Sequence, residues 1–165
     1  MANKEAVKKW VEALRSGNYK QGKGALRVTQ GRELSPSEDR FCCLGVACDL
    51  AEREGVMLDV NFTTRGDQYE HDGEWDVSYD GDHLELPEAV QDWLGIHESN
   101  PLIERYGLVD RAGLRGRERP DAYRFKLDDY NNPDLNRTLA EINDGIDNSF
   151  GLIANLIEAQ YLIED

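Results

Sequence analysis

One segment in the first third of the chain decides which folds are possible. Phe41 to Glu54, FCCLGVACDLAERE, is a predicted helix that Gly55 ends, and its first half is apolar almost all round. A helix without a polar face is buried inside a domain, so we expect this segment to be the central helix. Cys42, Cys43 and Gly45 are small, which allows a neighbouring element to pack closely against it.

Other segments show helical or strand periodicity. Asn3 is suited to cap a helix that runs to about Ser16, and Leu58–Tyr79 alternates around Asp72-Gly73 as a β-hairpin does. The other predicted elements are a strand at Ala25–Thr29, a loop at Gly31–Asp39, helices opening at Pro87, Pro101 and Pro133, a loop at 111–120, a strand at 123–127, a break at Asn143-Asp144-Gly145 and a last helix capped by Asn148 or Ser149. We expect one α+β domain, residues 1–165, with roughly five helices and a small antiparallel sheet.

The charge is unevenly distributed along the chain. The formal net charge is −14, yet the first 32 residues hold eight lysines and arginines against two glutamates. An acidic protein is repelled by nucleic acid and by anionic membranes, so we expect neither as a direct partner. The basic N-terminal fifth is either an exposed patch or a set of residues that pair with acidic neighbours in the fold.

The expected location is the cytoplasm. No apolar run approaches the roughly 18 residues of a membrane helix, and the first ten residues, MANKEAVKKW, lack the apolar stretch of a signal peptide. The three cysteines, Cys42, Cys43 and Cys48, are an odd number in one short segment. This pattern favours reduced thiols over a disulfide framework.

The glycine-rich stretch SGNYKQGKGALR, Ser16 to Arg27, indicates a binding site. Glycines let the backbone turn and present N–H groups to an anion, and basic side chains add charge. The spacing is not that of a P-loop, and no strand precedes it as in a dinucleotide-binding fold. The alternative is a flexible connector. The predicted ligand-binding residues are Arg15, Tyr19, Lys20, Gln21, Lys23, Arg27, Trp75, Asn143 and Asp144, for a small anionic, nucleotide-like ligand without cofactor or metal.

Three other groups of residues have a functional and a structural interpretation. Cys42 or Cys43 would be a nucleophile if a histidine folded nearby, but buried structural cysteine is the commoner outcome at the start of an apolar helix. The acidic residues of the hairpin would suit a divalent cation, although their spacing fits no calcium loop and a solvated face explains them. Asn143 and Asp144 either cap helix ends or contact a ligand.

Four segments together resemble a family of small proteins found in bacteriophage and prophage genomes. They are WVEALRSGNYKQGKGALR, FCCLGVACDLA, LPEAVQDWLGI and LAEINDGIDNSFGLIANLIEA. The resemblance covers most of the chain and implies a phage origin, and it brings no enzymatic activity with it. By analogy, small accessory phage proteins often inhibit host defence, either as sponges for nucleotide-derived immune signals or as acidic mimics of nucleic acid. Sponges often assemble as homo-oligomers, so a homo-oligomer is expected by the same analogy.

Three functions therefore stand as hypotheses. The first is a non-enzymatic protein that captures a nucleotide-derived defence signal at the glycine-rich loop. The second is an inhibitor whose acidic body docks on a basic host defence protein, steered by charge. The third is a nucleotide-processing hydrolase, which would depend on Cys42, Asp144 or a metal ion.

Overall fold

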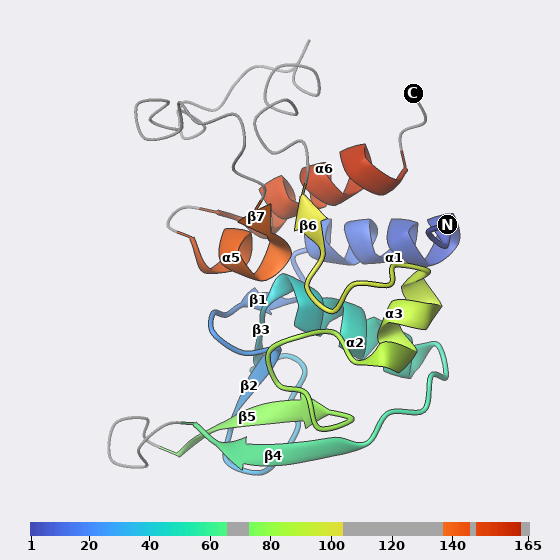
Figure 1. Cartoon of the computed structure of the whole chain (residues 1–165). Helices are drawn as coiled ribbons and strands as arrows, with labels where there is room; N and C mark the ends of the chain where they lie inside the picture. The colour runs from blue at the N-terminus through green and yellow to red at the C-terminus, as the bar shows by residue number, and fades with distance from the viewer. Residues whose placement is uncertain (66–72, 104–136, 146–147, 163–165) are drawn as a thin grey trace.

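Helix α2, Cys43–Arg53, lies at the centre of the computed structural model, which describes residues 1–65, 73–103, 137–145 and 148–162 (Figure 1). Eight of its residues are buried, from Cys43 through Asp49 together with Ala51. The predicted central helix is thus confirmed, with a later start. Phe41 belongs to a strand, and Cys42 caps the helix by accepting a hydrogen bond on Sγ from the N–H of Gly45 at 3.4 Å.

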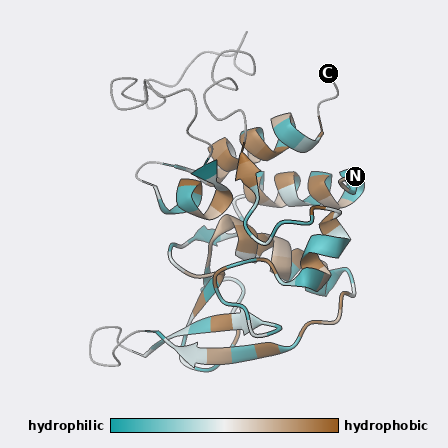
Figure 2. Ribbon diagram, viewed as in Figure 1, coloured by the Kyte–Doolittle hydropathy of each residue, from teal (hydrophilic) through white to brown (hydrophobic). Residues whose placement is uncertain are grey.

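Four more helices surround α2 in the described part of the chain: α1 (Lys4–Arg15), α3 (Glu88–Leu94), α5 (Leu139–Asp144) and α6 (Phe150–Tyr161). Helix α1 begins at the predicted cap, since the Asn3 side chain accepts from the N–H of Ala6. Its apolar face is buried against α2 and α6, and Trp10 Nε1 donates to the carbonyl of Cys43 at 2.9 Å. Figure 2 shows the apolar residues gathered along α1, α2 and α6.

The larger sheet has five strands in the order β1-β3-β2-β5-β4. They are β1 (Lys20–Gln21), β2 (Arg27–Gln30), β3 (Arg40–Phe41), β4 (Val60–Thr64) and β5 (Glu74–Tyr79). The predicted hairpin is confirmed as β4 and β5, with Phe62 opposite Val77. The sheet is mixed, because β1 runs parallel to β3 whereas the other pairs are antiparallel.

One predicted helix is replaced at its start by a strand, and another begins later than predicted. Leu102–Ile103 forms strand β6, which pairs with β7 (Arg137–Thr138), where the sequence suggested a helix from Pro101. Helix α5 begins only at Leu139, because Thr138 and Glu141 form a capping box there. The segment Pro133–Asn136, the predicted loop at 111–120 and the predicted strand at 123–127 lie outside the described residues.

The other helix ends follow the sequence signals closely. Pro87 is the N-cap of α3, and Gly95 ends that helix in the left-handed conformation at φ 63°. Ser149 caps α6 by accepting from the N–H of Leu152. An α+β fold is thus established. None of the helices in the described ranges is both long enough and apolar enough to cross a bilayer.

Candidate functional site

Two exposed cations of the predicted site, Arg15 at the end of α1 and Lys20 in the glycine-rich loop, have carboxylate partners within the fold. Arg15 Nη2 lies 2.6 Å from a carboxylate oxygen of Glu158 on α6, and the Arg15 hydrogen bond lowers the pKa of that carboxyl. Lys20 Nζ lies 2.9 Å from Glu38. For these two cations, the second of the two alternatives for the basic N-terminal fifth applies, because they pair with acidic neighbours in the fold.

Arg27 is buried in an ionic cluster beneath the sheet, with only 1% of its surface exposed. Its guanidinium lies 2.6 Å from Asp39 and 3.6 Å from Asp49. Tyr19 joins this cluster by donating its hydroxyl to Asp49 Oδ2 at 2.7 Å. Burial and this hydrogen bond raise the pKa of Tyr19. The sequence predicted that Asp39 ends an exposed loop, but the residue is only 2% exposed. Its carboxylate is buried because it forms an ion pair with the buried guanidinium of Arg27.

Trp75 is half-buried on β5 and lies between Thr29 and Thr64 in the strand register. The guanidinium of Arg32 covers one face of its ring, 4.2 Å from the centroid. This cation–π contact stabilises the pair by about 0.5–1 kcal/mol at an exposed site. It also occupies one of the two faces on which a base would stack.

Four of the predicted site residues do come together, in a contact that we call the clasp. It joins residues 21–24 of the loop to Asn143, Asp144, Gly145, Asn148 and Phe150. Gln21 donates to the carbonyl of Asn148 at 2.9 Å and accepts from the N–H of Phe150 at 3.2 Å. Lys23 Nζ donates to the carbonyl of Gly145 at 3.0 Å, and the N–H of Gly24 donates to Asp144 Oδ1 at 3.1 Å.

Asn143 is the centre of the clasp and is completely buried. Its Oδ1 accepts from the N–H of Cys43, the first residue of α2, at 3.0 Å, and from Gln21 Nε2 at 3.2 Å. Its Nδ2 donates to the carbonyl of Gly22 at 2.8 Å. One amide therefore satisfies backbone groups in two segments about 100 and 121 residues away. The loop therefore binds the Asn-Asp turn directly, which brings together two segments that the sequence analysis had assigned to one binding site.

The cysteines lie in the core as free thiols. Burial raises the pKa of Cys42 to about 12 and raises those of Cys43 and Cys48 as well. At neutral pH these groups are therefore thiols and not the thiolates that nucleophilic catalysis requires. The described residues contain no group of three or more potential metal ligands.

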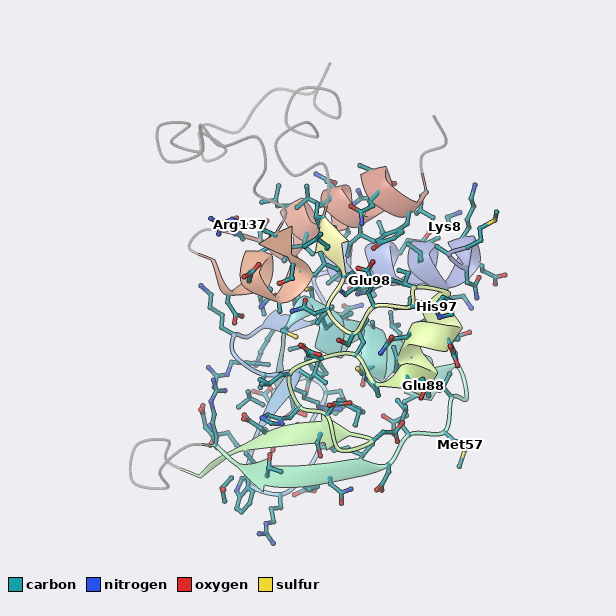
Figure 3. The ribbon with its side chains drawn as sticks, viewed as in Figure 1. Lys8, Met57, Glu88, His97, Glu98 and Arg137 are labelled. Carbon is teal, nitrogen blue, oxygen red and sulfur yellow. The ribbon has the colours of Figure 1, made fainter. Side chains whose placement is uncertain are left out.

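Unpaired negative charge gathers around α3. From residue 66 to residue 104 the sequence contains no lysine or arginine. We call the following carboxylates the acidic face, because within the described part of the chain none has a lysine or arginine partner: Asp80, Asp82, Glu85, Glu88, Asp92 and Glu98. Figure 3 shows Glu88, His97 and Glu98 on the side where α3 lies.

A hollow of about 500 Å³ opens on the acidic face. It is lined by Asp80, Asp82, Pro87, Glu88, Ala89 and Asp92. Sequence reasoning located the acidic segment at Asn61–Asp82 and so missed most of this face. The available signal was the 39-residue interval without a basic side chain, residues 66–104, which extends well beyond the hairpin.

Comparison with known proteins gives a family but no activity. The model of a domain of unknown function, DUF8296, matches residues 2–161. No curated protein and no solved structure matches the chain.

Proposed function

Because the chain belongs to the DUF8296 family, whose description names no activity, we propose its function from the geometry of the site. The protein is a non-enzymatic binding protein that docks through its acidic face on a basic surface of a partner protein. This is the second of the three functions that the sequence left open.

The observation that supports this function is the contrast between paired cations and unpaired carboxylates. Arg15, Lys20 and Arg27 have carboxylate partners, whereas the acidic face has no lysine or arginine partner in the described residues. Gathered like charges oppose folding by self-repulsion. A basic partner removes that repulsion and associates faster because the charges steer the encounter.

The phage-like motifs extend the proposal to the origin of the protein and to the cell compartment in which it acts. We assign the protein to a phage and its partner to the defence proteins of the infected host, which places both in the host cytoplasm. The three free thiols support a reducing compartment. The hydrolase hypothesis has less support, since its candidate nucleophiles, Cys42 and Cys43, are buried thiols.

Affinity capture from host extract, followed by reconstitution with the purified partner, tests the proposal. The acidic-face variant carries Asp82→Asn, Glu88→Gln and Asp92→Asn. The matched control carries Glu12→Gln, Glu33→Gln and Glu52→Gln, which are exposed carboxylates outside that face. Both variants raise the net charge by three units, so only the position of the lost charge differs between them.

We expect the wild type and the matched control to retain the same partner at low salt and to lose it as the salt rises. The Debye length shortens from about 10 Å at 0.1 M to about 3 Å at 1 M. The acidic-face variant should bind the purified partner about tenfold or more weakly, mainly through slower association. Equal affinities of the two triple variants for the partner would refute docking through this face.

A further inference from the structure

Asp144 holds an anionic oxygen against the glycine-rich loop. Its Oδ1 accepts from the N–H of Gly24 and from Asn143 Nδ2, both at 3.1 Å. Gly24 has φ +75°, a conformation that glycine adopts without strain. Asp144 itself is exposed, so this oxygen lies at a place that solvent and small ions reach.

Two cations bind backbone carbonyls of the residues that adjoin this contact, and neither forms an ion pair with Asp144. Lys23 donates to the neutral carbonyl of Gly145 at 3.0 Å, and no carboxylate in the described part of the chain lies within ion-pair distance of its ammonium. Arg65 Nη2 donates to the carbonyl of Lys23 at 3.0 Å and lies 3.4 Å from where a Cβ on Gly24 would stand. Its nearest carboxylate is that of Asp76, at 3.8 Å.

We propose that the loop is an oxyanion site which Asp144 fills from within the same chain, and that a phosphate group binds there by displacing this carboxylate. A phosphate has more acceptor oxygens and more charge than a carboxylate. It can accept from Gly24 and Asn143 and still present an oxygen toward Lys23, whose ammonium binds the carbonyl of the residue next to Asp144. The ligand class is therefore a small phosphate or phosphate ester, which retains the capture hypothesis in a form that is independent of the acidic face.

The tethered carboxylate sets the affinity. A phosphate binds only the fraction of molecules in which Asp144 has swung out, so the apparent dissociation constant is the intrinsic one divided by that fraction. Removing the carboxylate makes every molecule competent and also removes a like charge from the site. Affinity for phosphate should therefore increase when Asp144 is replaced, which is the opposite of the usual effect of altering a binding site.

Inorganic pyrophosphate is the probe, measured by calorimetry and by the backbone amide shift of Gly24 in nuclear magnetic resonance spectra. The variants are Asp144→Ala, Asp144→Asn and Asp144→Ala combined with Lys23→Ala. The control is Glu12→Gln, which removes one exposed carboxylate on α1. Asp144→Asn keeps an acceptor oxygen for Gly24 and so preserves the fold if the alanine variant is unstable.

We expect Asp144→Ala to bind pyrophosphate about tenfold or more tightly than the wild type, with a shift of the Gly24 amide, and Asp144→Asn to lie between them. Adding Lys23→Ala should reverse the gain, and Glu12→Gln should match the wild type. The proposal is overturned if neither Asp144 variant binds more tightly than Glu12→Gln, or if the gain persists without Lys23.

Discussion

Adding a single methyl group at Gly45 should strongly destabilise the fold. A Cβ built there lies 1.6 Å from the carbonyl oxygen of Leu26 and 2.5 Å from its carbonyl carbon. Leu26 cannot easily move away, because its carbonyl accepts from Cys42 and its N–H donates to His83 at 2.8 Å. Real Cβ atoms essentially never approach closer than 3.0 Å, so α2 and Leu26, the residue before β2, must separate by about 1.4 Å within the buried core.

The expected change in the free energy of unfolding is the sum of two destabilising contributions and one stabilising contribution. Overpacking a core costs about 3 kcal/mol at the upper end of the usual range, and weakening the buried hydrogen bond from Cys42 costs about 1 kcal/mol more. Alanine is better than glycine in a helix by about 1 kcal/mol. Gly45→Ala should therefore lower the free energy of unfolding by about 3 kcal/mol, a large fraction of the 5–15 kcal/mol typical of a domain.

Gly151→Ala is the matched control, since it is another helical glycine near the start of a helix. A Cβ there meets its nearest atom, Ser149 Oγ, at 3.7 Å, which is ordinary contact. This variant should gain about 0.5–1 kcal/mol. Urea unfolding followed by tryptophan fluorescence measures both changes. A Gly45→Ala protein that unfolds at or above the wild-type urea concentration would refute the close packing of α2 on Leu26.

Four further predictions concern the buried polar groups, the thiols and one exposed ion pair. Asn143→Ala should lose about 2–4 kcal/mol in urea unfolding, because it leaves buried backbone groups without partners. Arg27→Met should lose about 3–5 kcal/mol for the same kind of reason, since it leaves buried carboxylates uncompensated; an unchanged melting temperature would contradict this. Cys42, Cys43 and Cys48 should not react with a thiol reagent in the native protein at pH 8 and should react after unfolding. The Arg15 hydrogen bond lowers the folded pKa of Glu158, so this ion pair should stabilise the fold above about pH 4.3. The stability difference between wild type and Arg15→Ala should vanish as the pH falls through the folded pKa, which thermal unfolding at several pH values measures.

Local signals predicted the elements well where one segment carries the whole reason for its structure. The caps at Asn3 and Ser149 and the central α2 follow from side chains within a few residues of each element. The start of α5 also has a local signal, which is the capping box of Thr138 and Glu141. Sequence reasoning missed this signal because Pro133 indicated an earlier start.

The candidate site was harder to predict because its contacts join distant segments. Gln21 and Asn143 are 122 residues apart, and no local pattern in either segment indicates that the two are in contact. Charge counts cannot tell whether a cation meets a carboxylate of its own fold, as Arg27 does, or remains free for a ligand. The sequence likewise left open whether Asn143 caps a helix end or contacts a ligand, because that depends on which distant segment lies beside it.

The clasp also has a consequence for how the protein is made. Translation adds about 5–20 residues per second, so Gln21 waits roughly 6–25 s for Asn143 to be synthesised. Helix α1 waits longer still for α6, and until then the first helix and the loop lack their principal partners. We expect a ribosome that stalls before residue 139 to release a chain that lacks both α5 and α6, and such a chain should be bound by chaperones or degraded by proteases.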